Sequence, residues 1–430
     1  MMSQIKAVRG TRDLLPPETE LWNRVEATAR RVFERYAFGE IRTPIFEDTQ
    51  LFARGVGEET DIVSKEMYTW EDRPRAQSEK AQMLTLRPEN TAGVVRAYIE
   101  HKLGDSGLLQ KLYYIGPQFR RERPQKGRYR QFYQIGAEVI GPVSAGSESP
   151  LRDAEVLEML ATFLDELGVT GWTLELNSVG SAQDRPRYVE ALRAALTDVA
   201  PTLCVDCQRR AGTNPLRVLD CKVPEDQEKI NALPKIADFL DEDSRAHFAA
   251  VLAALDACDV RYTVNPRLVR GLDYYTRTTF EFTHGGLGAQ NALLGGGRYD
   301  GLSEAIGGPK APGIGFAIGA DRLVLTLQAA VSGSAASELA DAYVAPLGVA
   351  QQAEALLLAR ELRRAGLRVE LGDGSFRLKK SFEMGNKVAR AIVLFGEDEA
   401  RSGVMTVKNF AAGEQAKVAR GELAEFLRTK

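Results

Sequence analysis

The chain has few cysteines and few histidines, and it lacks any apolar run long enough to cross a membrane. Four cysteines among 430 residues argue against a disulfide framework. Three histidines are too few for an imidazole-based metal cluster or catalytic triad. Because the N-terminal residues contain neither an apolar signal core nor a small-residue cleavage site, we expect a cytoplasmic protein with no membrane contact.

The cysteines also leave a metal site incomplete. Cys204, Cys207 and Cys221 could supply three thiolates to a zinc ion, which usually takes four ligands. The next cysteine is Cys258 and His247 stands alone, so a fourth ligand at a suitable spacing is missing. We therefore expect no metal site, and leave open whether these thiols ever bind a metal.

Positive charge is concentrated in one segment of a chain whose formal net charge is only −3. The cations between positions 120 and 130 are Arg120, Arg121, Arg123, Lys126, Arg128 and Arg130, against one acid, Glu122. A local cluster of this kind is suited to binding phosphates.

Alternating residues on both sides of this cluster predict a hairpin with one polar face. That face carries Gln118, Arg120 and Glu122 from the first strand and Arg130, Phe132, Gln134, Gly136 and Glu138 from the second. A solvated outer face is the plainer interpretation, but Phe132 lies among the charges. We therefore expect the hairpin to grip a polyphosphate, stack an adenine and hydrogen-bond a small polar substrate.

Further along the chain, the patterns indicate a core that is interrupted and then resumed. A helix is expected over residues 18–37 and a strand over 39–46. A linker is expected over 329–338, followed by strands and helices that alternate. The expected divisions are 1–170 and 261–328 for a core of antiparallel sheet flanked by helices (α+β class), 171–260 for a helical insertion, and 338–430 for a C-terminal α/β domain.

The C-terminal domain contains a second local excess of cations. Between Arg360 and Arg390, nine Arg or Lys residues accompany four acids. A solvated helix surface would explain this composition. A nucleic-acid-binding face is a reasonable rival interpretation because the cations are clustered.

Several motifs resemble those of class II aminoacyl-tRNA synthetases. Phe119-Arg120-Arg121-Glu122 is similar to their motif 2, the helix and strand over residues 18–46 to motif 1, and Gly313 to Arg322 to motif 3. No GxxxxGK[ST] sequence occurs, so ATP binding must depend on arginine instead of a P-loop. Two further stretches, from Arg270 to Tyr275 and from Gly295 to Gly301, resemble signatures of histidyl-tRNA synthetases.

This resemblance covers essentially the whole chain and implies both a fold and a reaction. The fold would be a class II catalytic core with a helical insertion and a C-terminal α/β anticodon-binding domain, assembled as a homodimer. The reaction would join L-histidine to the tRNA for histidine through a histidyl-adenylate. ATP would be a substrate, accompanied by Mg²⁺.

The resemblance also assigns roles to individual residues. Arg120 and Arg270 would be catalytic. Histidine would be bound by Glu89, Asn90, Thr91, Arg120, Gln134, Glu138, Arg270, Tyr274, Tyr275 and Tyr299; ATP by Arg120, Glu122, Phe132 and Arg322; the tRNA acceptor end by Arg123, Gln125 and Lys126. Regular strand alternation would place Tyr274 and Tyr275 on opposite faces, and we expect Tyr275 to touch the substrate. Asn90 stands where the family often has glycine, and Asp321 where many members have glutamate.

Two other functions are compatible with parts of the sequence. One is a regulatory paralog that binds histidine and controls the phosphoribosyltransferase of histidine biosynthesis without aminoacylation. Such proteins usually lack the terminal domain and the catalytic arginine, and both are present here. The other is a tRNA-binding module without catalysis, which the presence of Arg120, Arg270 and Arg322 disfavours.

Overall fold

The computed structural model describes residues 4–57, 60–72, 81–125, 127–272, 274–287, 291–330 and 339–429. The chain forms two compact units, Met1–Gly333 and Ser334–Lys430. Most of the linker expected over residues 329–338 lies outside the described residues. In the part that is described, no helix has the length and apolar character that a membrane crossing requires.

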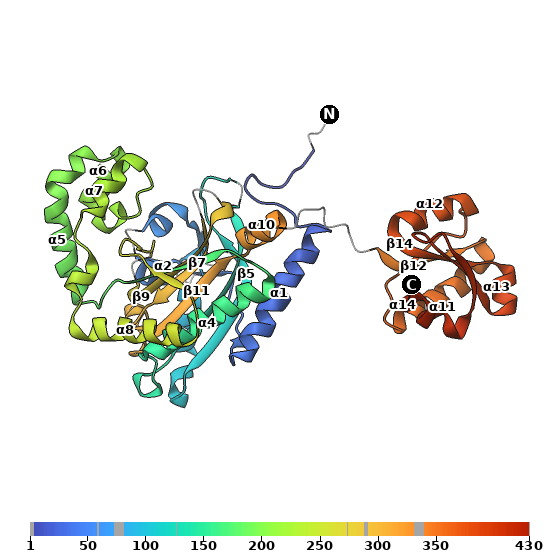
Figure 1. The fold of residues 1–430 in the computed structure, drawn as a ribbon, viewed down its shortest axis with the longest axis horizontal. Helices are drawn as coiled ribbons and strands as arrows, with labels where there is room; N and C mark the ends of the chain where they lie inside the picture. Colours follow the sequence, from blue (N-terminus) through green and yellow to red (C-terminus); the bar gives the residue numbers. More distant parts are fainter. Residues whose placement is uncertain are drawn as a thin grey trace. The chain divides into compact units, whose positions relative to one another are not determined.

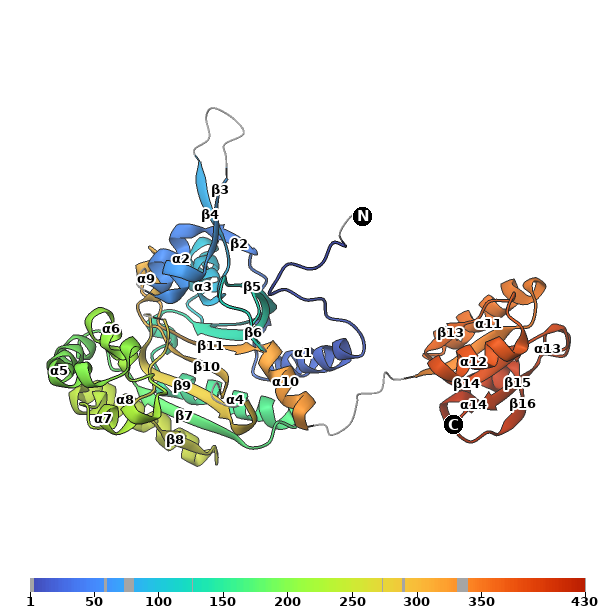
Figure 2. The same cartoon turned by 90° about the horizontal axis from the view of Figure 1, so that it is seen from above.

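The first unit is built on an eight-stranded sheet in the order β1-β5-β6-β11-β10-β9-β7-β8 (Figures 1 and 2). Its strands are β1 (Gly39–Glu40), β5 (Gln110–Phe119), β6 (Gln131–Ile140), β7 (Trp172–Ser178), β8 (Tyr262–Val264), β9 (Thr276–His284), β10 (Ala292–Arg298) and β11 (Gly313–Gly319). The pairs from β5 to β7 across the sheet are antiparallel, and the outer pairs β1–β5 and β7–β8 are parallel. The antiparallel core expected from the sequence is confirmed.

Four helices bury one face of this sheet in a common apolar core. They are α1 (Glu18–Arg35), α4 (Pro150–Leu167), α8 (Glu242–Ala257) and α10 (Ala320–Ala330). Helix α1 contributes Trp22, Val25, Ala29, Val32 and Phe33, which recur at the spacing of one helical face. Because this side of the sheet is filled by hydrocarbon, the polar residues of the strands are left to the opposite side.

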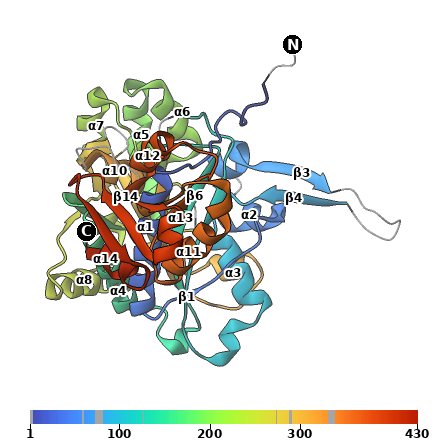
Figure 3. The same ribbon diagram turned by 90° about the vertical axis from the view of Figure 1, so that its right-hand side faces the viewer.

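The strand expected over residues 39–46 is interrupted in the structure. Only Gly39 and Glu40 pair with β5, and the chain then passes through Pro44, which has no backbone N–H to donate to a strand partner. It continues as β2 (Phe46–Asp48), which joins β4 (Gln82–Leu86) and β3 (Tyr68–Asp72) in a three-stranded sheet. Strands β3 and β4 project from the first unit (Figures 2 and 3).

The helical insertion is shorter than the expected range of 171–260. Strand β7 pairs with β9, and Val251 and Leu255 of α8 join the main core, so both ends of that range belong to the large sheet and its helices. The separate apolar core lies among α5 (Asp184–Val199), α6 (Val205–Thr213) and α7 (Gln227–Asn231). Helix α7 ends at Asn231, shortly before Pro234, which cannot donate a helical hydrogen bond.

The second unit has a five-stranded sheet in the order β13-β12-β14-β15-β16. Its elements are β12 (Ala340–Pro346), α11 (Gln352–Arg364), β13 (Val369–Leu371), α12 (Leu378–Val388), β14 (Ala389–Phe395), α13 (Glu397–Ser402), β15 (Val404–Asn409), β16 (Gln415–Ala419) and α14 (Leu423–Thr429). Strands β13, β12 and β14 are parallel, as the alternation of strands and helices predicts. The short edge strand β16 is not evident from the sequence because it is mostly polar and exposed.

A buried ion pair joins the two separated parts of the large sheet and its helices. Arg298 of β10 donates from Nη2 to the Asp153 carboxylate of α4 at 2.7 Å, and both side chains are fully buried. His247 of α8 contacts the same carboxylate at 2.8 Å. Burial would raise the pKa of Asp153, but the Arg298 charge and the hydrogen bonds from both partners outweigh it, so the net pKa is lowered.

Replacing Asp153 with alanine should strongly destabilise the first unit, because Arg298 would remain buried without its partner. We expect a loss of about 3–5 kcal/mol in denaturant unfolding. A carboxyl group whose pKa is lowered on folding stabilises the folded protein at pH values above the pKa that the group has in the unfolded chain. This stabilisation is lost as the pH falls through the pKa of the folded state. The difference between wild type and Asp153→Ala should therefore shrink as the pH falls. The exposed Asp198→Ala is the matched control, and equal unfolding midpoints for all three proteins would contradict the role of this pair.

Candidate active site

A broad open pocket lies over the polar face of the β5–β6 hairpin. Its empty space is about 2910 Å³, with open solvent at the mouth included, which exceeds the size of a pocket for one small ligand. The predicted site residues that line it are Glu89, Thr91, Arg120, Glu122, Phe132, Gln134, Arg270, Tyr274, Tyr275, Tyr299 and Arg322. Segments more than 200 positions apart in the chain thus meet at one cavity.

The hairpin register turns the polar side chains toward this pocket. Strands β5 and β6 pair antiparallel, with Gln118 opposite Phe132 and Gly116 opposite Gln134. The intervening residues Ile135, Ala137 and Val139 are buried in the apolar core beneath the helices. The alternation expected from the sequence is therefore confirmed for this hairpin, and the interpretation of its polar face as a freely solvated surface is wrong.

Arg120 and Phe132 form one wall of the pocket. The Nε of Arg120 donates to the Pro88 carbonyl at 2.9 Å, and its guanidinium carbon lies 5.2 Å from the centre of the Phe132 ring. Glu122 pairs with Arg128 at 3.3 Å. These contacts hold a cation, an aromatic ring and a carboxylate in fixed positions along the hairpin, where they can meet the parts of a nucleotide.

The loop that carries Arg270 lies against the run of three glycines in β10. Arg270 forms an ion pair with Glu281 of β9, and its Nε is buried without a hydrogen-bond partner among the described residues. A Cβ atom added at Gly295 would come within 2.6 Å of this guanidinium, closer than atoms pack. Glycine at position 295 therefore makes room for Arg270 beside the sheet.

The two adjacent tyrosines do not follow the strand alternation that we expected. Strand β9 begins only at Thr276, so Tyr274 and Tyr275 lie in a loop, where alternation does not apply. Both line the pocket, with ring centres 4.7 Å apart, and Tyr274 also packs edge-on against Tyr299 at 6.0 Å. The expectation that only one tyrosine faces the pocket is thus corrected.

Glu138 does not line the pocket itself but is buried behind Thr91 and Tyr299, which do, and whose hydroxyl groups it contacts. It accepts hydrogen bonds from Thr91 Oγ1 at 2.7 Å, Tyr299 OH at 2.7 Å and Tyr114 OH at 3.4 Å. Burial outweighs these bonds and raises the pKa of Glu138 to about 8. A Cβ at Gly315 would lie only 1.6 Å from its Oε2, so glycine is required there for the carboxyl group to fit.

The side chain of Glu89 caps the start of helix α3 (Thr91–Glu100), whose N-cap position is Asn90. Its carboxylate accepts from the backbone N–H groups of Thr91 at 2.8 Å and Ala92 at 3.0 Å, and burial raises its pKa nonetheless. Asn90 does not line the pocket: it is buried, and its Oδ1 accepts from Thr43. The direct histidine contact expected of Asn90 stays a prediction.

Motif 3 is a strand followed by a helix, as its sequence predicts. Strand β11 leads into α10, and Arg322 in the first turn donates to the Ala292 carbonyl at 3.0 Å. Burial, and then the nearby Arg128, lower the pKa of Arg322, which favours an anion in front of it. The preceding Asp321 also lines the pocket, but both of its carboxylate oxygens have protein partners: it accepts from the Tyr133 N–H at 3.1 Å and from Arg12 at 3.2 Å.

The residues expected to meet the tRNA acceptor end lie outside the pocket. Arg123 and Gln125 are exposed in the turn between β5 and β6 and do not line the cavity. Lys126 lies outside the described residues. The exposed turn can reach a large ligand, whereas the pocket below it can enclose a small one.

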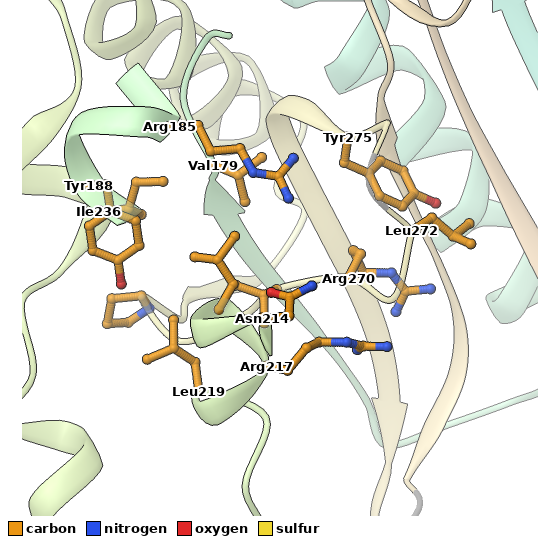
Figure 4. A pocket seen from close by; sticks show the side chains of 13 residues that line it. Val179, Arg185, Tyr188, Asn214, Arg217, Leu219, Ile236, Arg270, Leu272 and Tyr275 are labelled. Atoms are coloured by element: carbon orange, nitrogen blue, oxygen red, sulfur yellow. The ribbon is translucent and has the colours of Figure 1, made fainter. Parts of the chain in front are cut away.

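A smaller cavity adjoins the large one behind the Arg270 loop. Arg185, Arg217 and Arg270 line it together with apolar residues of the insertion (Figure 4). Arg217, Arg270 and Tyr275 line both cavities. The insertion therefore forms part of the wall that supports the Arg270 loop.

Two residues of the site were missed in the sequence. Tyr114 reaches Glu138, and extending the period-two pattern of β5 backwards from Gln118 would have found it. Glu281 pairs with Arg270 and shares a face of β9 with Thr279 and Thr283. Its partner lies in a loop, so no sequence spacing indicates that contact.

Comparison with known proteins agrees with this geometry over almost the whole chain. A family described as Histidyl-tRNA synthetase matches residues 10–323, and one described as Anticodon binding domain matches residues 341–430. The chain is 73% identical over 425 residues to a histidine–tRNA ligase of Koribacter versatilis, covering 99% of this chain and 96% of that protein. It is 58% identical to the histidine–tRNA ligase of Solibacter usitatus, covering 98% and 99%.

A solved structure shows the same fold. The apo histidyl-tRNA synthetase of S. aureus superimposes with a TM-score of 0.79 at 36% identity, over 99% of this chain and 100% of that chain. The sequence identity and the structural match both extend over the first unit and the second unit. The chain belongs to the histidyl-tRNA synthetase family.

Proposed function

We propose that this pocket activates L-histidine with ATP and then transfers the histidyl group to its cognate tRNA. Ligation of histidine to tRNA follows from membership of the family. The observation that carries the mechanism is the presence of Arg120, Arg270 and Arg322 around one cavity, beside the buried Glu138 cluster. Guanidinium groups can hold phosphates, and the cluster can bind a polar side chain.

In the first step, a carboxylate oxygen of histidine attacks the α-phosphorus of ATP. A new O–P bond forms, the bond to the β-phosphate breaks, and pyrophosphate leaves with the electron pair. An α-carboxyl group with a pKa of about 3.5 is already ionised at neutral pH, so no general base is needed. Arg120 and Arg270 align the two reactants and stabilise the negative charge that develops on the phosphorus oxygens.

Glu122, Phe132 and Arg322 orient the nucleotide in this proposal. Phe132 stacks on adenine, and Arg322, whose pKa is lowered by burial, meets the γ-phosphate. Mg²⁺ prefers carboxylate and phosphate oxygens, and Glu122 and Glu281 both line the pocket, so the residues fit an ion held mainly by ATP. When bound, Mg²⁺ would neutralise phosphate charge.

Histidine is recognised by the buried polar groups at the base of the pocket. Glu89 and Thr91 are placed to meet the ammonium group, and Gln134, Glu138 and the tyrosines to meet the imidazole. The Oε1 of Gln134 is buried and has no hydrogen-bond partner within the described part of the chain. A wrong amino acid would leave such groups unpaired, and a site of this kind discriminates by about 10⁴ or more without an editing domain.

In the second step, a hydroxyl of the terminal adenosine of tRNA attacks the histidyl carbonyl and AMP leaves. We assign acceptor contacts to Arg123, Gln125 and Lys126, and anticodon contacts to the domain expected over residues 338–430. The catalytic core would comprise residues 1–170 and 261–328, together with β7 and α8 from the range between them. Assembly as a homodimer and a cytoplasmic location belong to the same proposal.

The regulatory alternative is not favoured. Two relatives that match the chain over nearly its full length, from Koribacter versatilis and Solibacter usitatus, are histidine–tRNA ligases. The terminal unit and the arginine at position 270, which such regulators usually lack, are both present in this chain.

Replacing Arg270 with alanine should lower histidine-dependent exchange between ATP and pyrophosphate by about 10²–10³-fold, because the developing phosphate charge loses a fixed partner. The exposed Arg261→Ala is the matched control and should retain full exchange. Exchange at the wild-type rate in Arg270→Ala would reject its catalytic role, whereas no exchange in the wild type would reject the proposed reaction.

Replacing Glu138 with glutamine should change both stability and histidine affinity. The pKa of Glu138 is raised to about 8 on folding, so wild type loses stability as the pH rises from the ordinary glutamate pKa through this value. Glutamine cannot titrate, and Glu138→Gln should lose less across the same range in thermal unfolding.

The same variant should raise the KM for histidine more than the KM for ATP in the exchange assay, because only the amino acid is placed at Glu138. The exposed Glu304→Gln serves as the control. Equal pH slopes for wild type and Glu138→Gln would show that this carboxyl group does not carry the raised pKa.

Helix α12 offers a test of tRNA binding by the terminal unit. Lys379 and Lys380 are exposed there, and the double change of Lys379 and Lys380 to Glu should weaken tRNA binding. It should also flatten the dependence of log affinity on log salt, by about 0.7–0.9 for each lost phosphate contact. ATP–pyrophosphate exchange should be unchanged. Lys417→Glu on edge strand β16 is the control, and equal tRNA affinity in all three proteins would exclude α12 as a binding face.

A further inference from the structure

Four potential metal ligands meet in the helical insertion, and one of them, Cys221, also lines the large pocket. The sulfur atoms of Cys204, Cys207 and Cys221 and a carboxylate oxygen of Asp226 all lie within 4.8 Å of one another. Cys207 and Cys221 are buried, Asp226 is 3% exposed, and Cys204 is partly exposed. Sequence reasoning found the thiols but sought the fourth ligand only among cysteines and histidines, so the prediction of an incomplete site needs correction.

Local structure brings these side chains together from three short elements. Cys204 precedes helix α6 and Cys207 lies in its first turn. Cys221 follows the 3₁₀ turn Pro215–Val218, and Asp226 ends the turn Pro224–Asp226 just before α7. The spacing of the first two cysteines is that of many structural zinc sites.

The distances suit tetrahedral coordination. Zinc–sulfur bonds of about 2.3 Å place neighbouring sulfurs about 3.8 Å apart, and a carboxylate oxygen about 3.6 Å from a sulfur. The Sγ atoms of Cys204 and Cys221 are 3.9 Å apart, and Cys221 Sγ lies 3.4 Å from Asp226 Oδ2. The ligand atoms therefore already stand close to the positions around a zinc ion.

The surroundings favour ligation over simple burial of thiols. The backbone N–H of Cys204 donates to Asp226 Oδ2 at 3.0 Å, which fixes the carboxylate beside the three thiols. A cation that accepts thiolates would relieve the cost of crowding these acidic groups.

We propose that Cys204, Cys207, Cys221 and Asp226 bind one structural zinc ion. Soft thiolate ligands select zinc among the common divalent ions, and a fully protein-ligated site is structural because no position is open to substrate. Binding displaces a proton from each thiol, so zinc uptake weakens as the pH falls.

The site would also brace the loop that carries Arg270. Arg267 donates from its guanidinium to the carbonyl oxygens of Leu219, at 2.9 Å, and Cys221, at 3.1 Å. It also reaches Gln227 Oε1 at 2.7 Å. A zinc ion that fixes Cys221 and Asp226 would hold these acceptors in place, three positions before the proposed catalytic arginine.

The experiment measures metal in the full chain, purified under reducing conditions without a metal-binding tag. Elemental analysis should find about one zinc per chain in wild type and in Cys258→Ser, whose exposed thiol lies outside the cluster. Cys221→Ser should lose most of this zinc. Asp226→Asn, which keeps every thiol, should release its zinc to a chelator faster than wild type does.

A second measurement uses only the wild-type protein, so it still tests the proposal if a variant fails to fold. Wild-type protein stripped with a chelator and titrated with Co²⁺ should develop a thiolate-to-cobalt charge-transfer band, which zinc then abolishes. Retention of full zinc by Cys221→Ser would overturn the proposal. So would reduced wild-type protein that takes up neither zinc nor cobalt, or a disulfide between Cys204 and Cys221 in protein that binds no metal. None of these readouts depends on aminoacylation.

Discussion

The register of β5 against β6 is the constraint on which the rest of the pocket depends. Ile135, Ala137 and Val139 are packed beneath the helices, and this packing turns the intervening residues of β6 to the other side of the sheet. A shift by one residue would exchange the two faces. It would bury charged groups in hydrocarbon and expose apolar ones, so the apolar core fixes where the polar groups stand.

The glycines of β10 and β11 complete what this register begins. Arg270 lies over Gly295 and Glu138 lies beside Gly315, each at a place where an added Cβ would collide with the functional group. Strands normally gain stability from contacts between side chains. Strands β10 and β11 lose part of this stabilisation at their glycines. The space gained admits a guanidinium and a carboxyl group close to the sheet, which is how ionisable groups from distant segments come to share one cavity.

Regular elements could be read from the sequence, whereas irregular ones could not. A regular period of apolar residues indicates which side of an element is buried, and it occurs in the β5–β6 hairpin, in helix α1 and in the second unit. No such period applies to Tyr274 and Tyr275, because they lie in a loop before β9. The capping of α3 by the Glu89 side chain was not predicted, because spacing in the sequence does not reveal its bonds to the backbone. Asp226 was overlooked because a carboxylate carries no distinctive spacing relative to cysteines.

The order of strands in the large sheet bears on how the protein is made. Strand β6 pairs on one side with β5, its neighbour along the chain, but on the other with β11, which begins at Gly313. During synthesis at about 5–20 residues per second, the ribosome exposes that edge of β6 for many seconds before its partner emerges. An unpaired strand edge of this kind can pair with other chains. Chaperones would therefore matter most to this enzyme while β6 has been synthesised and β11 has not.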